Sequence, residues 1–87
     1  MTEEKITIQN KSGLHARPAA LLVKEAGNYT SNIQLVKEDK QADAKSLLGV
    51  MSLSVRKGDE IAIRAEGEDE DQAAQQLRDL IESGLGE

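Results

Sequence analysis

The sequence has 87 residues, which is room for one hydrophobic core, and we expect a single domain over residues 1–87. It has no cysteine and one histidine, which excludes disulfides, zinc–thiolate sites and metal sites with several histidine ligands, and no cofactor is expected. The net charge is −5, no basic run occurs and Tyr29 is the sole aromatic residue, so direct binding to nucleic acid is not expected.

The first part of the chain predicts a strand, a loop and a helix. Lys5–Gln9 alternates polar and apolar residues, which is typical of a half-buried strand. A helix is predicted from about Ala16 to Ala26, with Pro18 in its first turn, where a missing N–H costs nothing. Its buried face would hold Ala19, Leu22, Val23 and Ala26. Gly27 and Asn28 would end it with residues that tolerate left-handed backbone.

The middle of the chain predicts a hairpin and a short helix. Asn32–Lys37 alternates again, Lys37–Lys40 is expected to turn, and Gln41–Ala44 would form a short third strand. Ser46 is a good N-cap residue before the apolar run of Lys45–Leu53. That run is too short for a free-standing helix, so we expect one or two turns held by packing.

The last third predicts a strand and a helix. Arg56–Asp59 is expected to turn, and Glu60–Ala65 is the clearest strand of the sequence. After Gly67, the acids of Glu68–Asp71 suit the positive end of a helix. The buried face of this helix would hold Ala73, Leu77, Leu80 and Ile81, and Gly84 with Leu85 would form its glycine C-cap.

The order β-α-β-β-α-β-α, with one apolar face per element, predicts an α+β fold. We expect a two-layer open-faced sandwich, in which a four-stranded antiparallel sheet is covered on one side by three helices. No apolar run could span a membrane, and the charged start of the chain, Met1–Lys5, is not a signal peptide. We therefore expect a cytoplasmic protein without membrane insertion.

His15 is the candidate reactive residue, because it lies where a loop is expected to become a helix. The backbone N–H groups at such a helix end, here those of Ala16 and Arg17, carry partial positive charge. This charge and the Arg17 guanidinium disfavour an imidazolium, so a neutral, nucleophilic ring is expected. The same groups would bind a phosphoryl group placed on that ring.

Two other interpretations of His15 are open on the residues alone. A lone histidine near a helix start is more often a cap or a surface residue, with its neighbouring arginine simply solvated. A small hydrolase with His15 as its base is a weaker alternative, since no G-x-S-x-G motif occurs.

The chain contains two distinctive motifs, Gly13-Leu14-His15-Ala16-Arg17-Pro18-Ala19 and Lys45-Ser46-Leu47-Leu48-Gly49-Val50-Met51-Ser52-Leu53. They resemble those of the HPr family, the histidine-containing phosphocarriers of the bacterial phosphoenolpyruvate:sugar phosphotransferase system. The resemblance extends over nearly the whole chain. It implies a phosphocarrier that is not itself an enzyme: His15 accepts a phosphoryl group from enzyme I and passes it to enzyme IIA domains of sugar permeases. Arg17 would be the electrostatic partner of the phosphate.

The resemblance also implies a regulatory role for Ser46. In part of the family, an HPr kinase/phosphorylase phosphorylates the serine at this place, and the phosphoserine form binds the catabolite control repressor. Without the resemblance, Ser46 would be read as a plain N-cap. The surface that meets partners is expected to contain Leu14, Ala20, Lys24, Leu47, Leu48 and Met51, on a monomeric protein.

A second functional hypothesis comes from a regulatory paralogue in the same family, Crh, which has glutamine in place of His15. Ala19-Ala20-Leu21 and Gly67-Glu68-Asp69-Glu70 resemble Crh as much as HPr. The alternative is therefore a module that acts in carbon catabolite repression through phosphorylated Ser46, with His15 secondary.

Overall fold

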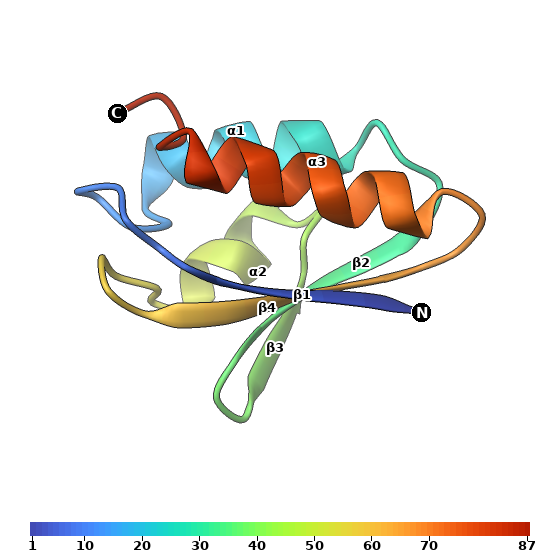
Figure 1. The fold of residues 1–87 in the computed structure, drawn as a ribbon. Coiled ribbons are helices and arrows are strands. Elements are labelled where there is room, and N and C mark those ends of the chain that lie inside the picture. The colour runs from blue at the N-terminus through green and yellow to red at the C-terminus, as the bar shows by residue number, and fades with distance from the viewer.

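The structure, a computed structural model, describes residues 1–87 and has the element order β1-α1-β2-β3-α2-β4-α3 (Figure 1). The strands are β1 (Thr2–Thr7), β2 (Asn32–Lys37), β3 (Lys40–Asp43) and β4 (Glu60–Glu66). The helices are α1 (Ala16–Ala26), α2 (Leu47–Ser52) and α3 (Glu70–Glu82). The three helices cover one face of the sheet and leave the other face open, which confirms the predicted fold class. None of the helices has the length and apolar character that a membrane span requires.

The sheet is antiparallel throughout, in the order β1-β4-β2-β3. The first strand pairs with the last along its whole length, from Thr2 opposite Ala65 to Thr7 opposite Glu60. Because side chains alternate between the two faces of a strand, one face of β4 can face the helices while the other faces solvent. The resulting core is aliphatic, and its largest buried side chains are Ile8, Leu14, Leu22, Ile33, Leu35, Ile61, Ile63, Leu77, Ile81 and Leu85.

The boundaries of three strands differ from the predictions, which were Lys5–Gln9, Gln41–Ala44 and Glu60–Ala65; the last of these strands, β4, is longer by one residue. β1 begins at Thr2, because polar residues at the start of the chain find partners along β4. It ends at Thr7, although Ile8 is still buried and its N–H donates to the Asp59 carbonyl at 2.8 Å. β3 lies one residue earlier than predicted, since the connection from β2 is a tight two-residue turn.

The two long helices end in different ways. The predicted end of α1 at Gly27 is confirmed, but this residue keeps right-handed backbone, with φ −65° and ψ −14°, and its N–H donates to the Val23 carbonyl. The prediction at Gly84 is confirmed, with φ +94°. The N–H groups of Gly84 and Leu85 donate to the carbonyls of Ile81 and Leu80, which is the glycine-capped helix end with its apolar residue buried.

The buried faces of α1 and α3 agree with the predicted stripes in most positions. Ala19, Leu22, Ala26, Ala73, Leu77 and Ile81 are all buried. Val23 and Leu80 are only half-buried, and Ala74 is an additional core residue of α3. The helices therefore present His15 and the end of α1 on a rigid, packed support.

Candidate functional site

His15 occupies the N-cap position of α1. Its backbone is extended, with φ −84° and ψ −173°, and its carbonyl accepts a hydrogen bond from Ala19 N–H at 2.8 Å. An N-cap side chain usually accepts a bond from the first turn. The imidazole of His15 makes no such bond, and the residue is exposed. Its ring is therefore free to react.

The first turn of α1 leaves its donors unused. The N–H groups of Ala16 and Arg17 have no hydrogen-bond partner in the chain, and Pro18 has no N–H. This turn contains no acidic residue. Arg17 is exposed and takes part in none of the five ion pairs. Two backbone donors and one cation are therefore available to an anion beside His15.

The loop before His15 lies directly on the segment that follows α2. Gly13 has φ +60°, and a Cβ atom there would lie 2.3 Å from the Val55 carbonyl oxygen. The next residue, Leu14, donates its N–H to that same oxygen at 3.1 Å. Only glycine allows both this backbone conformation and this close approach. Gly13 therefore fixes the position of the reactive loop through packing of backbone on backbone.

Glu87 also holds this loop. Its carboxylate accepts hydrogen bonds from Ser12 N–H at 2.9 Å and Ser12 Oγ at 2.6 Å, and from Asn10 Nδ2 at 3.2 Å. The Ser12 donors, together with Asn10, lower the pKa of Glu87. Nothing in the local sequence pattern indicated this contact, because the two residues are 75 positions apart.

A surface pocket of about 380 Å³ opens beside the imidazole. It is lined by Ser12, Leu14, His15, Met51, Ser54, Val55 and Arg56, none of which is acidic. Two other hollows lie on the open face of the sheet, among polar strand residues, and contain none of the predicted site residues. The pocket beside His15 is thus the one associated with a candidate nucleophile.

Ser46 is the N-cap of α2, as predicted: its Oγ accepts a hydrogen bond from Gly49 N–H at 3.1 Å. Leu47 and Leu48 follow at 41% and 82% exposed, whereas Val50 is fully buried. Because α2 packs against α1, these exposed leucines lie on the helix next to the one that carries His15.

Most residues predicted to meet partners are at the surface. Ala20 and Lys24 are exposed on α1, and Met51 is half-buried beside the pocket. The prediction for Leu14 is corrected, because only 2% of this residue is exposed and it belongs to the core. Its role is to anchor the loop. Leu21 was not among the predicted residues, but it is exposed on α1 although it is large and apolar.

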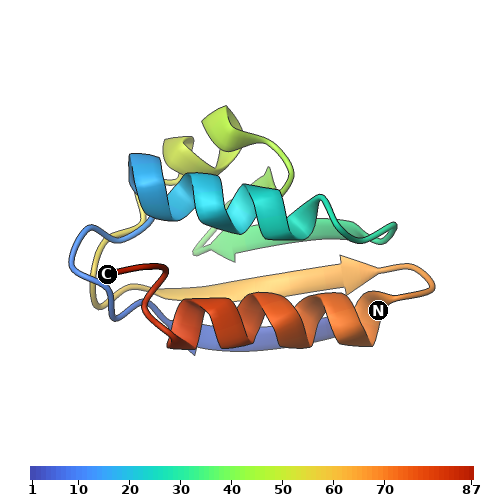
Figure 2. The ribbon, with the colours of Figure 1, turned by 90° about the horizontal axis from the view of Figure 1, so that it is seen from above.

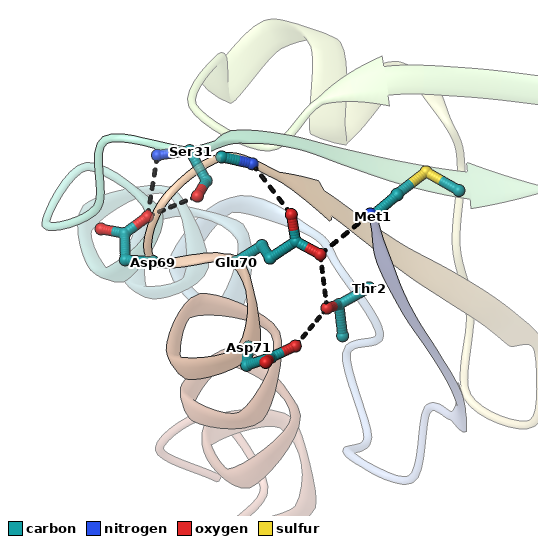
Figure 3. Close-up of polar contacts among 7 residues, drawn as sticks. Met1, Thr2, Ser31, Asp69, Glu70 and Asp71 are labelled. Carbon is teal, nitrogen blue, oxygen red and sulfur yellow. Dashed lines mark hydrogen bonds and ion pairs between the residues drawn. The ribbon is translucent and has the colours of Figure 1, made fainter.

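The opposite end of the helical layer contains a dense polar cluster around the start of α3 (Figure 3). Asp69 accepts hydrogen bonds from Thr30 N–H at 2.9 Å, Ser31 N–H at 3.0 Å and Ser31 Oγ. These donors, led by the Ser31 hydroxyl, lower the pKa of Asp69 to about 2. Glu70 accepts from the terminal amine of Met1 and from Thr2 Oγ1, both at 2.9 Å. The acids here are bound by the protein itself.

Comparison with known proteins identifies similar chains over nearly the full length. Residues 2–83 match the family model described as "PTS HPr component phosphorylation site". The chain is 44% identical over 82 residues to the HPr-like protein Crh of Bacillus subtilis, covering 94% of this chain and 96% of that one. It is 42% identical over 86 residues to the phosphocarrier protein HPr of Mycoplasma capricolum, covering 98% and 97%.

Solved structures agree with these relatives. HPr of Thermoanaerobacter tengcongensis superimposes with a TM-score of 0.97 at 50% identity, covering 100% of this chain and 98% of that one. A dimer of HPr from the same organism gives a TM-score of 0.81 with full coverage of both chains. A domain-swapped dimer of Crh from Bacillus subtilis gives 0.78 at 43% identity, covering 95% of each chain. Similarity to these proteins is therefore compatible with more than one oligomeric state.

Proposed function

The chain belongs to the HPr family of phosphocarrier proteins, and we propose that it carries a phosphoryl group on His15 within the phosphotransferase system. The HPr phosphocarriers of this family are not themselves enzymes. One observation carries the proposal: His15 is the N-cap of α1, its imidazole makes no capping bond, and the adjacent N–H groups of Ala16 and Arg17 are unpaired.

The transfer needs little covalent chemistry from the carrier. The lone pair of one His15 ring nitrogen forms a new P–N bond while the bond between phosphorus and the donor breaks. Positioning and charge stabilisation supply most of the catalysis in such in-line transfers. In this proposal the two free N–H groups and the Arg17 guanidinium bind the phosphoryl oxygens, and the exposed location lets the group leave again.

The proposed donor is enzyme I, and the proposed acceptors are enzyme IIA domains of sugar permeases. We define the docking face as Ala20, Lys24, Leu47, Leu48 and Met51. The exposed leucines of this face supply apolar contact area, and Lys24 supplies a positive charge for acidic partners. A carrier between these proteins works in the cytoplasm.

A labelling experiment tests the carrier function. The protein is incubated with enzyme I and radiolabelled phosphoenolpyruvate, and the acid lability of the incorporated label is measured. We expect acid-labile label in the wild type and none in His15→Ala, whose fold should persist because the side chain is exposed and makes no hydrogen bond. A wild type that takes up no acid-labile label contradicts the proposal.

A second candidate function is regulation through Ser46, as in Crh-type members of the family. The observation that favours it is the position of Ser46, half-buried at the N-cap of α2 and directly before the exposed Leu47 and Leu48. A phosphate at this place strengthens the helix start and adds charge beside the docking face. The proposed partners are the HPr kinase/phosphorylase and the catabolite control repressor.

The regulatory function predicts acid-stable label from ATP and the kinase, lost in Ser46→Ala. Ser52 is the matched control, since its hydroxyl is exposed on the same helix and donates to the Gly49 carbonyl at 2.7 Å. Ser52→Ala should keep the acid-stable label. Equal labelling of the wild type and Ser46→Ala would exclude Ser46 as the acceptor.

We propose that the carrier acts as a monomer. All four strands find their partners within one chain, and 20 buried hydrophobic residues form a single core cluster. Two of the similar solved structures are dimers, so the oligomeric state of this protein is to be measured directly. Light scattering at working concentration should give the mass of one chain, 9.4 kDa, and twice that mass would contradict the proposal.

A further inference from the structure

The pocket beside His15 contains a cation that lies outside the Gly13–Ala19 motif. Arg56 lines this pocket together with His15, whereas neither Ala16 nor Arg17 does. The imidazole is thus bordered by Arg56 on the pocket side and followed by Arg17 on the helix side. A group that enters this pocket is therefore in a space lined by both His15 and Arg56.

The backbone of Arg56 is fixed from two sides. A Cβ atom at Gly13 would lie 2.8 Å from Arg56 Cα, so the reactive loop packs directly on this residue. On the other side, the Arg56 N–H donates to Asp59 Oδ2 at 2.9 Å. Asp59 is itself paired with Lys37 at 3.1 Å. These contacts hold the Cα of Arg56 at a constant place relative to His15, while its side chain remains exposed.

The guanidinium of Arg56 forms no direct ion pair in the chain, although its charge is one of the causes that lower the pKa of Asp59. The five ion pairs involve Arg64, Arg78, Lys37 and the terminal amine only. No acid lines the pocket, in a chain with 16 acidic residues. The two carboxylates bonded to pocket residues are already engaged: Asp59 binds Lys37, and Glu87 binds the Ser12 hydroxyl at 2.6 Å. The pocket therefore has a cation that stands on a fixed backbone and has no direct ion-pair partner, and no acidic side chain lines it.

We propose that Arg56 binds the phosphoryl group as it passes between a partner's histidine and His15, opposite the groups at the start of α1. This inference rests on the proposed carrier function. In the transfer, the lone pair of a His15 nitrogen forms the new P–N bond. The P–N bond to the donor imidazole breaks, and its electron pair returns to the donor nitrogen.

Each imidazole keeps the proton on its second nitrogen, so no co-reactant is needed. The planar guanidinium of Arg56 donates to two oxygens of the moving group and offsets their charge. At about 380 Å³, the pocket is within the size range of small-molecule sites, which begins at about 300 Å³. It can therefore admit the phosphoryl group together with the ring that delivers it.

Steady-state phosphoryl transfer by enzyme I, with this carrier as the varied substrate, tests this role and gives kcat and KM separately. Arg56→Ala should lower kcat/KM by roughly tenfold or more, the usual effect of losing one charge-assisted hydrogen bond, with the loss in kcat. Arg56→Lys should recover part of the rate because it restores the charge. Lys57→Ala is the matched control: the neighbouring cation is exposed but does not line the pocket, so its rate should stay within about twofold of wild type.

A second measurement reports on the contact itself. The Nε–H resonance of Arg56 is followed by ¹⁵N NMR as His15 becomes phosphorylated, and we expect this resonance to shift. The Nζ resonance of Lys57, the matched control, should not shift. Equal kcat for Arg56→Ala and Lys57→Ala, or a change in KM alone, overturns the phosphoryl contact while the acid-labile label still supports the carrier function. If the wild type takes up no such label, both proposals fail.

Discussion

The helices α1 and α3 run along the same face of the sheet, and their N-termini lie at opposite ends of the molecule (Figures 1 and 2). Both ends carry the partial positive charge of a helix N-terminus. At α3 the charge is met by Asp69, Glu70 and Asp71, which are bound in turn by neighbouring segments. At α1 the first turn has no acid, and the N-cap imidazole makes no bond to it.

The difference between the two ends shows how one fold separates stability from function. The α3 end is closed, because its carboxylates hold β1 and the segment before β2 in place. The α1 end leaves its backbone N–H donors free for an external anion. The loop before His15 is held in place by the close packing of Gly13 on the backbone of Val55 and by the hydrogen bond from Ser12 to Glu87. The reactive end can therefore change charge during transfer without loss of the fold.

The largest expected effect comes from making the α1 end resemble the α3 end. Ala16→Glu places a carboxylate in the first turn of α1, where it competes with the phosphoryl group. We expect the rate of labelling at His15 to fall on the order of 100-fold, while stability is unchanged or rises by about 0.5 kcal/mol. Ala16→Gln is the neutral control and should label far faster. Equal rates for the two variants would mean that the absence of acids at this helix end has no function.

The second prediction concerns the support of the α1 end. Gly13→Ala should lower the free energy of unfolding by about 3 kcal/mol in urea titrations, because its Cβ would overlap the Val55 carbonyl and φ is +60°. Gly58 is the matched control: it has φ +95° but nothing within 4 Å of a Cβ. Gly58→Ala should lower the free energy of unfolding by only about 1 kcal/mol. Similar losses for both would reduce the role of Gly13 to backbone conformation alone.

The third prediction concerns the carboxylate of Asp69 at the α3 end. Asp69 has its pKa lowered from 3.8 to about 2, so its contribution to stability is complete above pH 4 and is lost as the pH falls towards 2. Asp69→Asn should lower the melting temperature at pH 7 and flatten its dependence on pH between 4 and 2. Asp79→Asn, on the exposed side of α3, should change neither the melting temperature at pH 7 nor its dependence on pH. Labelling of His15 should be unaffected in both variants, and a slower rate in Asp69→Asn would show that the two ends are coupled.

The smallest effect on stability is expected at Thr2, whose hydroxyl donates to the carboxylates of Glu70 and Asp71. Thr2→Val should cost about 0.5 kcal/mol, since the site is partly exposed and the acids keep other donors. Thr7→Val on the same strand, where no side-chain hydrogen bond is made, should be neutral or slightly stabilising in the same urea titration. A larger loss at position 7 would contradict the importance of the cluster.

The sequence pattern predicted correctly those features that depend on interactions between residues close together in the chain. The bounds of α1, the N-cap positions of His15 and Ser46, and the C-cap at Gly84 all follow from residues within one turn of each other. α1 also ends at Gly27 as predicted, but there the backbone stays right-handed despite the glycine. A glycine permits left-handed backbone but does not impose it.

The contacts that complete both helix ends could not be predicted in this way. Asp69 was expected to serve its own helix, but it bonds Ser31, which is 38 residues away. The placement of Arg56 beside His15 likewise depends on packing between Gly13 and a distant segment. Leu14, in the middle of the reactive motif, is buried for the same reason. Such pairs are set by the assembled sheet and helices rather than by any periodicity in the sequence.

The pairing of β1 with β4 has a consequence for how the protein is made. β1 has its only partner in residues 60–65, so it cannot pair until that later segment has also left the ribosome. Until then, the hairpin of β2 and β3 is the one part of the sheet that can form. Closing so long a loop before its contacts stabilise it slows folding. We therefore expect the domain to fold after synthesis, in one cooperative step, rather than progressively from its N-terminus.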